Sequence, residues 1–171
     1  MRKSLGDTIQ DMAMAVETRG AHTAGHQRRV ADLTIVIATE MSLTAGQIDG
    51  IRLTAAIHDI GKIIIPVEIF SKLKQLTDVE FRLIKTHDVA GYDILKYIEF
   101  PWPIASIILE HHERIDGSGY PNSLTGEEIL LESRILAVAD VVVAIASHRP
   151  YQTAHGIEVA LYEISKNSGT L

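Results

Sequence analysis

Apolar residues recur every three or four positions along most of the chain, a spacing that places them on one face of an α-helix. The first two segments with this pattern are residues 4–18 and 24–42, whose apolar positions are Leu5, Ile9, Met12 and Val16, and Val30, Leu33, Ile37 and Met41. We therefore expect two amphipathic helices at the start of the chain.

A threonine followed three positions later by glutamine or glutamate forms a capping box and marks the start of a helix. The sequence contains this pair at Thr44 and Gln47, at Thr77 and Glu80, and at Thr125 and Glu128. The first pair predicts a helix through Ile57, and the second a helix with Phe81 and Ile84 facing inward. Pro103 fits the first turn of a further helix that runs to His111.

A nearly continuous apolar run, residues 134–147, predicts a buried central helix. Residues 63–76 and 113–124 lack helical periodicity and are expected to be the two long loops. Ile63–Ile65 is short and precedes Pro66, so we expect extended loop there rather than a strand. Together these elements predict a single all-α domain, folded as a helical bundle.

The absence of cysteine from the sequence excludes disulfides and thiolate metal sites, so any metal must be held by nitrogen and oxygen atoms. The formal net charge of −6 argues against a general nucleic-acid binder, and we expect no DNA partner. The apolar runs are too short to span a bilayer, and Asp140 interrupts the run of residues 135–146. With no signal peptide recognisable, we expect a cytoplasmic protein without a membrane segment.

Two carboxylates stand where an ionised group is energetically expensive. Asp59 follows His58 at the end of an apolar helical segment, and Asp140 has apolar residues on every helical face around it. A buried carboxylate is stable when it is paired or bound to a metal ion. A core with buried His–Asp hydrogen bonds is one explanation of this pattern, and a metal site is the other.

The candidate metal ligands are His26, His58, Asp59, His87, His111, His112 and Asp140. These seven exceed what one ion needs, so they predict two divalent ions. Asp59 is the expected bridge, because one carboxylate can offer an oxygen to each ion. Imidazole and carboxylate ligands without sulfur suit iron, manganese, zinc or nickel.

Two motifs in the sequence carry a resemblance to a known family. One is His58-Asp59-Ile60-Gly61-Lys62, and the other is residues 111–121, His-His-Glu-Arg-Ile-Asp-Gly-Ser-Gly-Tyr-Pro. At this distance apart they resemble the HD-GYP family, a branch of the HD metal-dependent phosphohydrolases, and the resemblance extends from Glu17 to Tyr151. It implies a helical bundle of the HD phosphohydrolase type that hydrolyses the bacterial second messenger cyclic di-GMP to pGpG, GMP or both.

The resemblance also implies roles for single residues. The seven candidate ligands match the family's metal ligands, which makes iron or manganese the first expectation and zinc or nickel the alternatives. Asp59 and Lys62 match catalytic positions. Substrate contacts are expected from Arg149 and from the loop of Gly119, Tyr120 and Pro121.

Two acidic residues near this loop are expected to act without binding metal. Asp116 is expected to cap the loop. Glu113 has two interpretations: it holds a histidine tautomer, or it lies exposed at a helix end.

The departures from the family's pattern that we identify are Gly20, His22, Val143 and Gln152. His22 leaves a third ion open, while Val143 and Gln152 remove charge near the expected substrate. Two alternative functions follow. One is a catalytically weak module that binds cyclic di-GMP or docks a partner such as a diguanylate cyclase, and the other is an HD phosphohydrolase of another nucleotide.

The motifs also suggest how the chain is divided. We expect residues 1–18 to form a connector helix, outside the core, that contacts an upstream sensory domain or pairs in a homodimer. Residues 19–165 are expected to form the HD-GYP-like catalytic domain, and residues 166–171 a C-terminal tail. Because both ends look cut, we expect a piece of a longer protein.

Overall fold

The structure is a computed structural model and describes residues 5–18, 25–70, 72, 75–147 and 156–170. Within these residues the chain is helical, and the only β-structure is an isolated bridge between Asp116 and Thr125. This confirms the predicted all-α class. In chain order the elements are α1 (Leu5–Glu17), α2 (His26–Glu40), α3 (Ala45–Ile57), η1 (Ile60–Ile64), α4 (Val67–Phe70), α5 (Asp78–Ile84), α6 (His87–Leu95), α7 (Ile104–Glu110), η2 (Gly126–Glu128), α8 (Leu131–Ala146) and α9 (Gly156–Lys166), where η marks a 3-10 helix.

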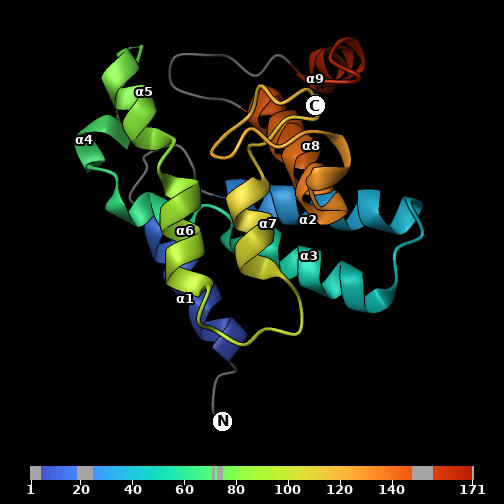
Figure 1. Cartoon of the computed structure of the whole chain (residues 1–171), viewed down its shortest axis with the longest axis horizontal. Coiled ribbons are helices and arrows are strands. Elements are labelled where there is room, and N and C mark those ends of the chain that lie inside the picture. Colours follow the sequence, from blue (N-terminus) through green and yellow to red (C-terminus); the bar gives the residue numbers. More distant parts are fainter. Residues whose placement is uncertain (1–4, 19–24, 71, 73–74, 148–155, 171) are drawn as a thin grey trace.

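The core forms where α2 packs against α3 and α8, and where α6 packs against η1 and α7 (Figure 1). Val30, Ile57, Ile108 and Leu136, from α2, α3, α7 and α8, are completely buried in it. Removing such side chains from water is the main favourable contribution to folding. The predicted central helix is therefore confirmed as α8. Among the described residues, no helix has the length and apolar character needed to cross a membrane.

All three predicted capping boxes are present. The Thr44 hydroxyl accepts a hydrogen bond from the Gln47 amide at 3.3 Å, and the Gln47 side chain accepts one from the Thr44 amide at 3.1 Å. The boxes at Thr77 and Thr125 have the same reciprocal form. The box at Thr125 opens only the short turn η2, however, and α8 begins separately at Leu131.

Some local expectations are wrong. Ile63 and Ile64 lie in the 3-10 helix η1 and not in an extended loop, because the chain turns tightly after Asp59 and the Lys62 amide bonds the Asp59 carbonyl at 2.9 Å. Phe81 does not face inward: it is 48% exposed, since α5 lies at the edge of the bundle and buries none of its residues. Helix α4 also occupies part of a predicted loop.

Helix α1 contributes to the core, which corrects the expectation that it lies outside. Ile9 and Ala13 are buried in the main hydrophobic cluster, and α1 packs against α3 and η1. Met12, which was expected on the apolar stripe, is 51% exposed instead. The boundary at residue 18 stays a prediction.

Gly61 allows η1 and α6 to touch backbone to backbone. A Cβ atom at Gly61 would collide with the carbonyl oxygen of His87 and would lie 2.5 Å from the amide nitrogen of Gly91. Real Cβ atoms do not approach backbone so closely, so the position requires glycine. The contact sets His87 at the start of α6 beside the turn that carries Asp59.

We expect Gly61→Ala to lower the free energy of unfolding by about 2 kcal/mol or more, because the added methyl group meets backbone that cannot move aside. Gly46→Ala in α3 is the matched control: nothing lies within 4 Å of the new Cβ atom, and alanine favours a helix by about 1 kcal/mol. Urea denaturation followed by circular dichroism measures both. Equal stability of the two variants would contradict the close contact.

Candidate metal centre

Three of the predicted ligands, His58, His87 and His111, come shortly after a helix ends, where the last carbonyl groups have no partner within the helix. In each case the ring Nδ1 bonds the carbonyl oxygen three residues earlier at 2.7 Å, and these carbonyls belong to Ala55, Ile84 and Ile108. A carbonyl oxygen can only accept, so each Nδ1 carries a proton. In the neutral form of such a ring, Nε2 is therefore a free lone pair.

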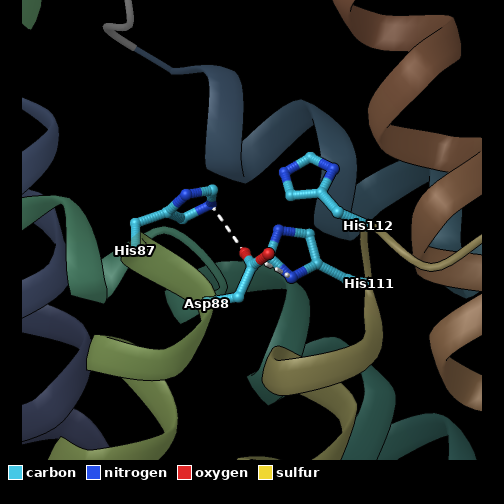
Figure 2. Close-up of side chains that lie close together, drawn as sticks. All are labelled: His87, Asp88, His111 and His112. Atoms are coloured by element: carbon cyan, nitrogen blue, oxygen red, sulfur yellow. Dashed lines mark ion pairs between the residues drawn. The ribbon is translucent and has the colours of Figure 1, made fainter. Parts of the chain in front are cut away.

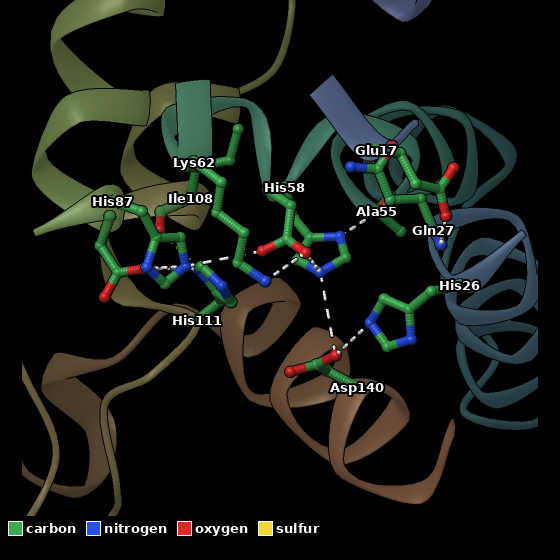
Figure 3. A network of polar contacts seen from close by, with 12 residues as sticks. Glu17, His26, Gln27, Ala55, His58, Lys62, His87, Ile108, His111 and Asp140 are labelled. Carbon is green, nitrogen blue, oxygen red and sulfur yellow. Dashed lines mark hydrogen bonds and ion pairs between the residues drawn. The ribbon is translucent and has the colours of Figure 1, made fainter. Parts of the chain in front are cut away.

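The three Nε2 atoms are buried, and none has a hydrogen-bond partner among the described residues. Figure 3 shows the rings of His58 and His111 with Asp140 and Lys62 in one polar network. A buried lone pair without a donor is costly, and a bound metal ion removes that cost. The Nδ1 bonds are also the kind that orients a metal-binding imidazole. The residues present thus fit a metal.

Asp59 lies between two of these histidines. Its Oδ2 is 3.6 Å from Nε2 of His58, and its Oδ1 is 3.6 Å from Nε2 of His87. Each carboxylate oxygen thus faces a different imidazole. This arrangement matches what a bridging carboxylate requires, and the bridging role itself stays a prediction.

Asp140, in the middle of α8, faces His26 at the start of α2 (Figure 3). The distance from its Oδ1 to Nε2 is 2.9 Å for His26 and 3.8 Å for His58. Burial disfavours the ionised form, but the hydrogen bond from His26 outweighs it and holds the pKa of Asp140 far below its ordinary value. This pair alone would suit a metal-free core, whereas the three orphaned Nε2 atoms do not.

Lys62, which matches a catalytic position of the family, contacts the other such residue, Asp59. Its Nζ lies 2.6 Å from Oδ2 of Asp59 and donates a hydrogen bond to it. Burial disfavours ionisation of Asp59, but Lys62 and the nearby histidines outweigh it and hold the pKa of Asp59 well below its ordinary value. Lys62 therefore compensates a carboxylate that an ion would otherwise neutralise.

The potential ligand atoms form three groups, and within each group they lie within 4.8 Å of one another. The groups share members and together contain all seven predicted ligands. One further residue, Asp88, joins them (Figure 2), and the prediction missed it. Its signal was visible, because His87-Asp88 repeats the His-Asp pair of positions 58 and 59. The groups are His87, Asp88, His111 and His112; His26, His58 and Asp140; and His58, Asp59 and His111.

Tyr120 covers one side of the centre. Its ring stacks on His112 with centroids 5.0 Å apart and planes 24° apart. The ammonium of Lys85 lies 4.5 Å from the centroid of the Tyr120 ring, a favourable cation–π distance. Lys85 is another residue that the sequence prediction missed. Burial raises the pKa of Tyr120, so its phenol stays protonated and can donate a hydrogen bond.

Glu113 organises the loop that carries Tyr120. This role differs from both interpretations made from the sequence, a residue that holds a histidine tautomer and an exposed residue at a helix end. Glu113 is 3% exposed, and its carboxylate accepts hydrogen bonds from the amides of Asn122 at 2.6 Å and Leu124 at 3.0 Å. Asp116 caps the loop as expected, accepting from the amide and the hydroxyl of Ser118.

Gly119 and Pro121, the other two predicted residues of the loop, lie on either side of Tyr120. A Cβ atom at Gly119 would collide with the backbone of Glu113, so the loop folds back onto the end of α7.

Some residues that the sequence analysis named lie outside the described residues, and Val143 lies elsewhere than expected. Arg149, His22 and Gln152 lie outside the described residues. Val143, expected to border the substrate, is 7% exposed and packs in the hydrophobic core instead.

We expect Glu113→Ala to loosen residues 117–124, because two part-buried amides lose a charged acceptor, and hydrogen bonds to charged groups are worth about 1.5–3 kcal/mol each. Hydrogen exchange should show faster exchange at Asn122 and Leu124. Glu127→Ala is the control, since that glutamate is 92% exposed and pairs only with Arg134 among the contacts described. Unchanged protection in Glu113→Ala would show that the loop holds its shape without the carboxylate.

Comparison with known proteins gives relatives over nearly the whole chain. The cyclic di-GMP phosphodiesterase response regulator RpfG of Xanthomonas campestris is 38% identical over 96% of this chain and 44% of its own length. A cyclic di-GMP phosphodiesterase of Thermotoga maritima is 40% identical over 98% of this chain and 46% of its own. The chain thus spans less than half of each of these relatives.

A solved structure and a family model point to the same family as these relatives. The crystal structure of a cyclic GMP-AMP-specific phosphodiesterase of Vibrio cholerae superposes with a TM-score of 0.68 at 20% identity, covering 97% of this chain and 45% of that one, which shows a shared fold. The family model of the HD domain matches residues 10–171 and so begins inside α1. The resemblance drawn from the two motifs is confirmed, and the chain belongs to the HD-domain family.

Proposed function

We propose that the chain is the catalytic domain of a metal-dependent phosphodiesterase that hydrolyses cyclic di-GMP to pGpG, GMP or both. The observation that carries the proposal is the set of three buried imidazoles with free Nε2 atoms around Asp59. Family membership and the names of the two relatives support the same activity.

The proposed cofactor is a pair of divalent ions, with iron or manganese as the first choice. One ion would be held by His26, His58 and Asp140, the other by His87, His111 and His112, and Asp59 would serve both. When bound, such ions supply Lewis acidity toward the phosphate and a nucleophile at neutral pH.

The chain's own groups have separate tasks in this proposal. The carbonyl bonds to Nδ1 fix the orientation of the imidazoles, so that each Nε2 faces the centre. Lys62 would leave Asp59 and contact the substrate phosphate, a charge-assisted bond. Tyr120 would stack on or donate to the nucleotide, while Arg149 would add a charge-assisted contact to the phosphate.

The direct test is incubation of the purified chain with cyclic di-GMP and Mn²⁺, or Fe²⁺ under reducing conditions, followed by chromatography of the products. Formation of pGpG or GMP is expected. Cyclic GMP-AMP in the same assay tests for another nucleotide substrate. Tight binding of cyclic di-GMP by calorimetry without turnover would favour the alternative, a binding or docking module, and absence of product with every metal would reject the enzyme.

Asp59→Ala is expected to lose most of both ions, because its two oxygens face different groups of imidazoles. Elemental analysis of the purified protein should find close to two ions per chain in the parent and much less in the variant. Asp93→Ala is the control, since that aspartate is 54% exposed and pairs with Lys96. Full metal occupancy in Asp59→Ala would show that the bridging assignment is wrong.

Lys62→Ala is expected to keep its metal and to lose about ten- to a hundredfold in catalytic efficiency, the effect of a lost charge-assisted contact of about 1.5–3 kcal/mol. Metal content should hold because Lys62 competes with an ion for the same Asp59 oxygen. Lys96→Ala removes a similar lysine–aspartate pair outside the centre, at 2.7 Å, and should change neither quantity. Parental efficiency in Lys62→Ala, or loss of its metal, would overturn this role.

Three expectations about the wider protein stay proposals. The chain would work in the cytoplasm, α1 would present its exposed side to an upstream sensory domain or to a second copy, and a diguanylate cyclase would be a docking partner. Met12 and Met14, both about half exposed on α1, are the apolar side chains available for such a contact.

A further inference from the structure

Asp88 is a buried carboxylate that the predicted ligand set does not explain. It is the second residue of α6, its side chain is 0% exposed, and neither of its oxygens has a hydrogen-bond partner among the described residues. An aspartate in the first turn of a helix ordinarily binds the free backbone amides there or faces solvent. Asp88 does neither, so its burial needs another cause.

The carboxylate lies between the rings of His87 and His111, as Figure 2 shows. Its Oδ1 is 3.0 Å from Nε2 of His87 and 3.6 Å from Nδ1 of His111. Nδ1 of His87 already donates to the Ile84 carbonyl, so Nε2 of the neutral ring is an acceptor. Two acceptors therefore face each other at 3.0 Å, and such a contact is repulsive unless both bind one cation.

We propose that Asp88 is a direct ligand of the ion that His87, His111 and His112 would hold, in addition to Asp59. The inference rests on the proposed metal centre. Ligand atoms with bonds of about 2.1 Å at a right angle lie about 3.0 Å apart, which is the distance between Oδ1 of Asp88 and Nε2 of His87. A second carboxylate also makes this ion's ligands richer in oxygen, which favours manganese over softer ions.

A proton on His87 is the competing explanation. Burial opposes protonation of His87, but Asp88 beside it raises the pKa of His87 above its ordinary value. In that case Asp88 and the imidazolium would neutralise each other, and an ion would have to displace the proton. The two explanations differ in what removal of the Asp88 charge does to metal affinity.

The test compares Asp88→Asn with the parent chain and with Asp93→Asn, which removes an exposed carboxylate from the same helix. Each metal-free protein is titrated with Mn²⁺ by calorimetry. We expect two ions in the parent, a loss of affinity of about 100-fold or more for one ion in Asp88→Asn, and parental binding in Asp93→Asn. A smaller loss of metal affinity, about 10- to 100-fold, is what the substitution of a residue that acts only through another ligand produces.

Parental or tighter binding of both ions by Asp88→Asn would overturn the assignment of Asp88 while leaving the metal centre intact. A parent chain that binds no ion would instead reject the proposed centre, and this inference with it. If Asp88→Asn does not fold, a crystal structure of the Mn²⁺-loaded parent decides. An Asp88 oxygen at about 2.2 Å from an ion supports the assignment, and a carboxylate turned away from the ion overturns it.

Discussion

The unpaired carbonyl at the end of a helix is the constraint on which the candidate metal centre depends. A helix leaves its last carbonyls without partners, and here Ala55, Ile84 and Ile108 each find one in an imidazole three residues later. One hydrogen bond thus satisfies the helix end, selects the tautomer and turns Nε2 inward. Because three helix ends meet at the same place in the fold, three lone pairs meet there as well.

That convergence would be unfavourable in an ordinary core. Asp59 and Asp88 lie beside these imidazoles and are almost completely buried, and the side chain of Asp140 is 17% exposed. Burying a carboxylate is expensive unless a cation compensates it, and Lys62 supplies one charge for Asp59. Neither oxygen of Asp88 has a hydrogen-bond partner among the described residues, so the structure favours further positive charge at the centre. Divalent ions fit that requirement better than protons, because each can contact several ligands at once.

The sequence predicted the features that depend on short-range chemistry. The capping boxes and the end of α3 at Ile57 follow from neighbouring residues. The candidate ligand pairs His58-Asp59 and His111-His112 were visible because their members are adjacent in the sequence. Burial could not be predicted in the same way. Phe81 and Met12 have apolar spacing yet face solvent, because the surfaces that would cover them belong to distant segments. The His87-Asp88 pair was visible in the sequence, but only the packing of α6 shows that the Asp88 carboxylate is enclosed.

The centre is therefore a product of tertiary packing, and its ligands come from separate elements that must arrive together. Gly61 lets α6 approach η1 closely enough for His87 to face Asp59. The carboxylate of Glu110 accepts from the Leu130 amide and so joins the end of α7 to the start of α8, the helix that carries Asp140. An unfolded chain cannot present these ligands together, so an ion binds the folded state preferentially and stabilises it. At an ion concentration of 100 times its dissociation constant this linkage is worth about 2.7 kcal/mol per ion, enough to offset a substantial part of the cost of burying three carboxylates.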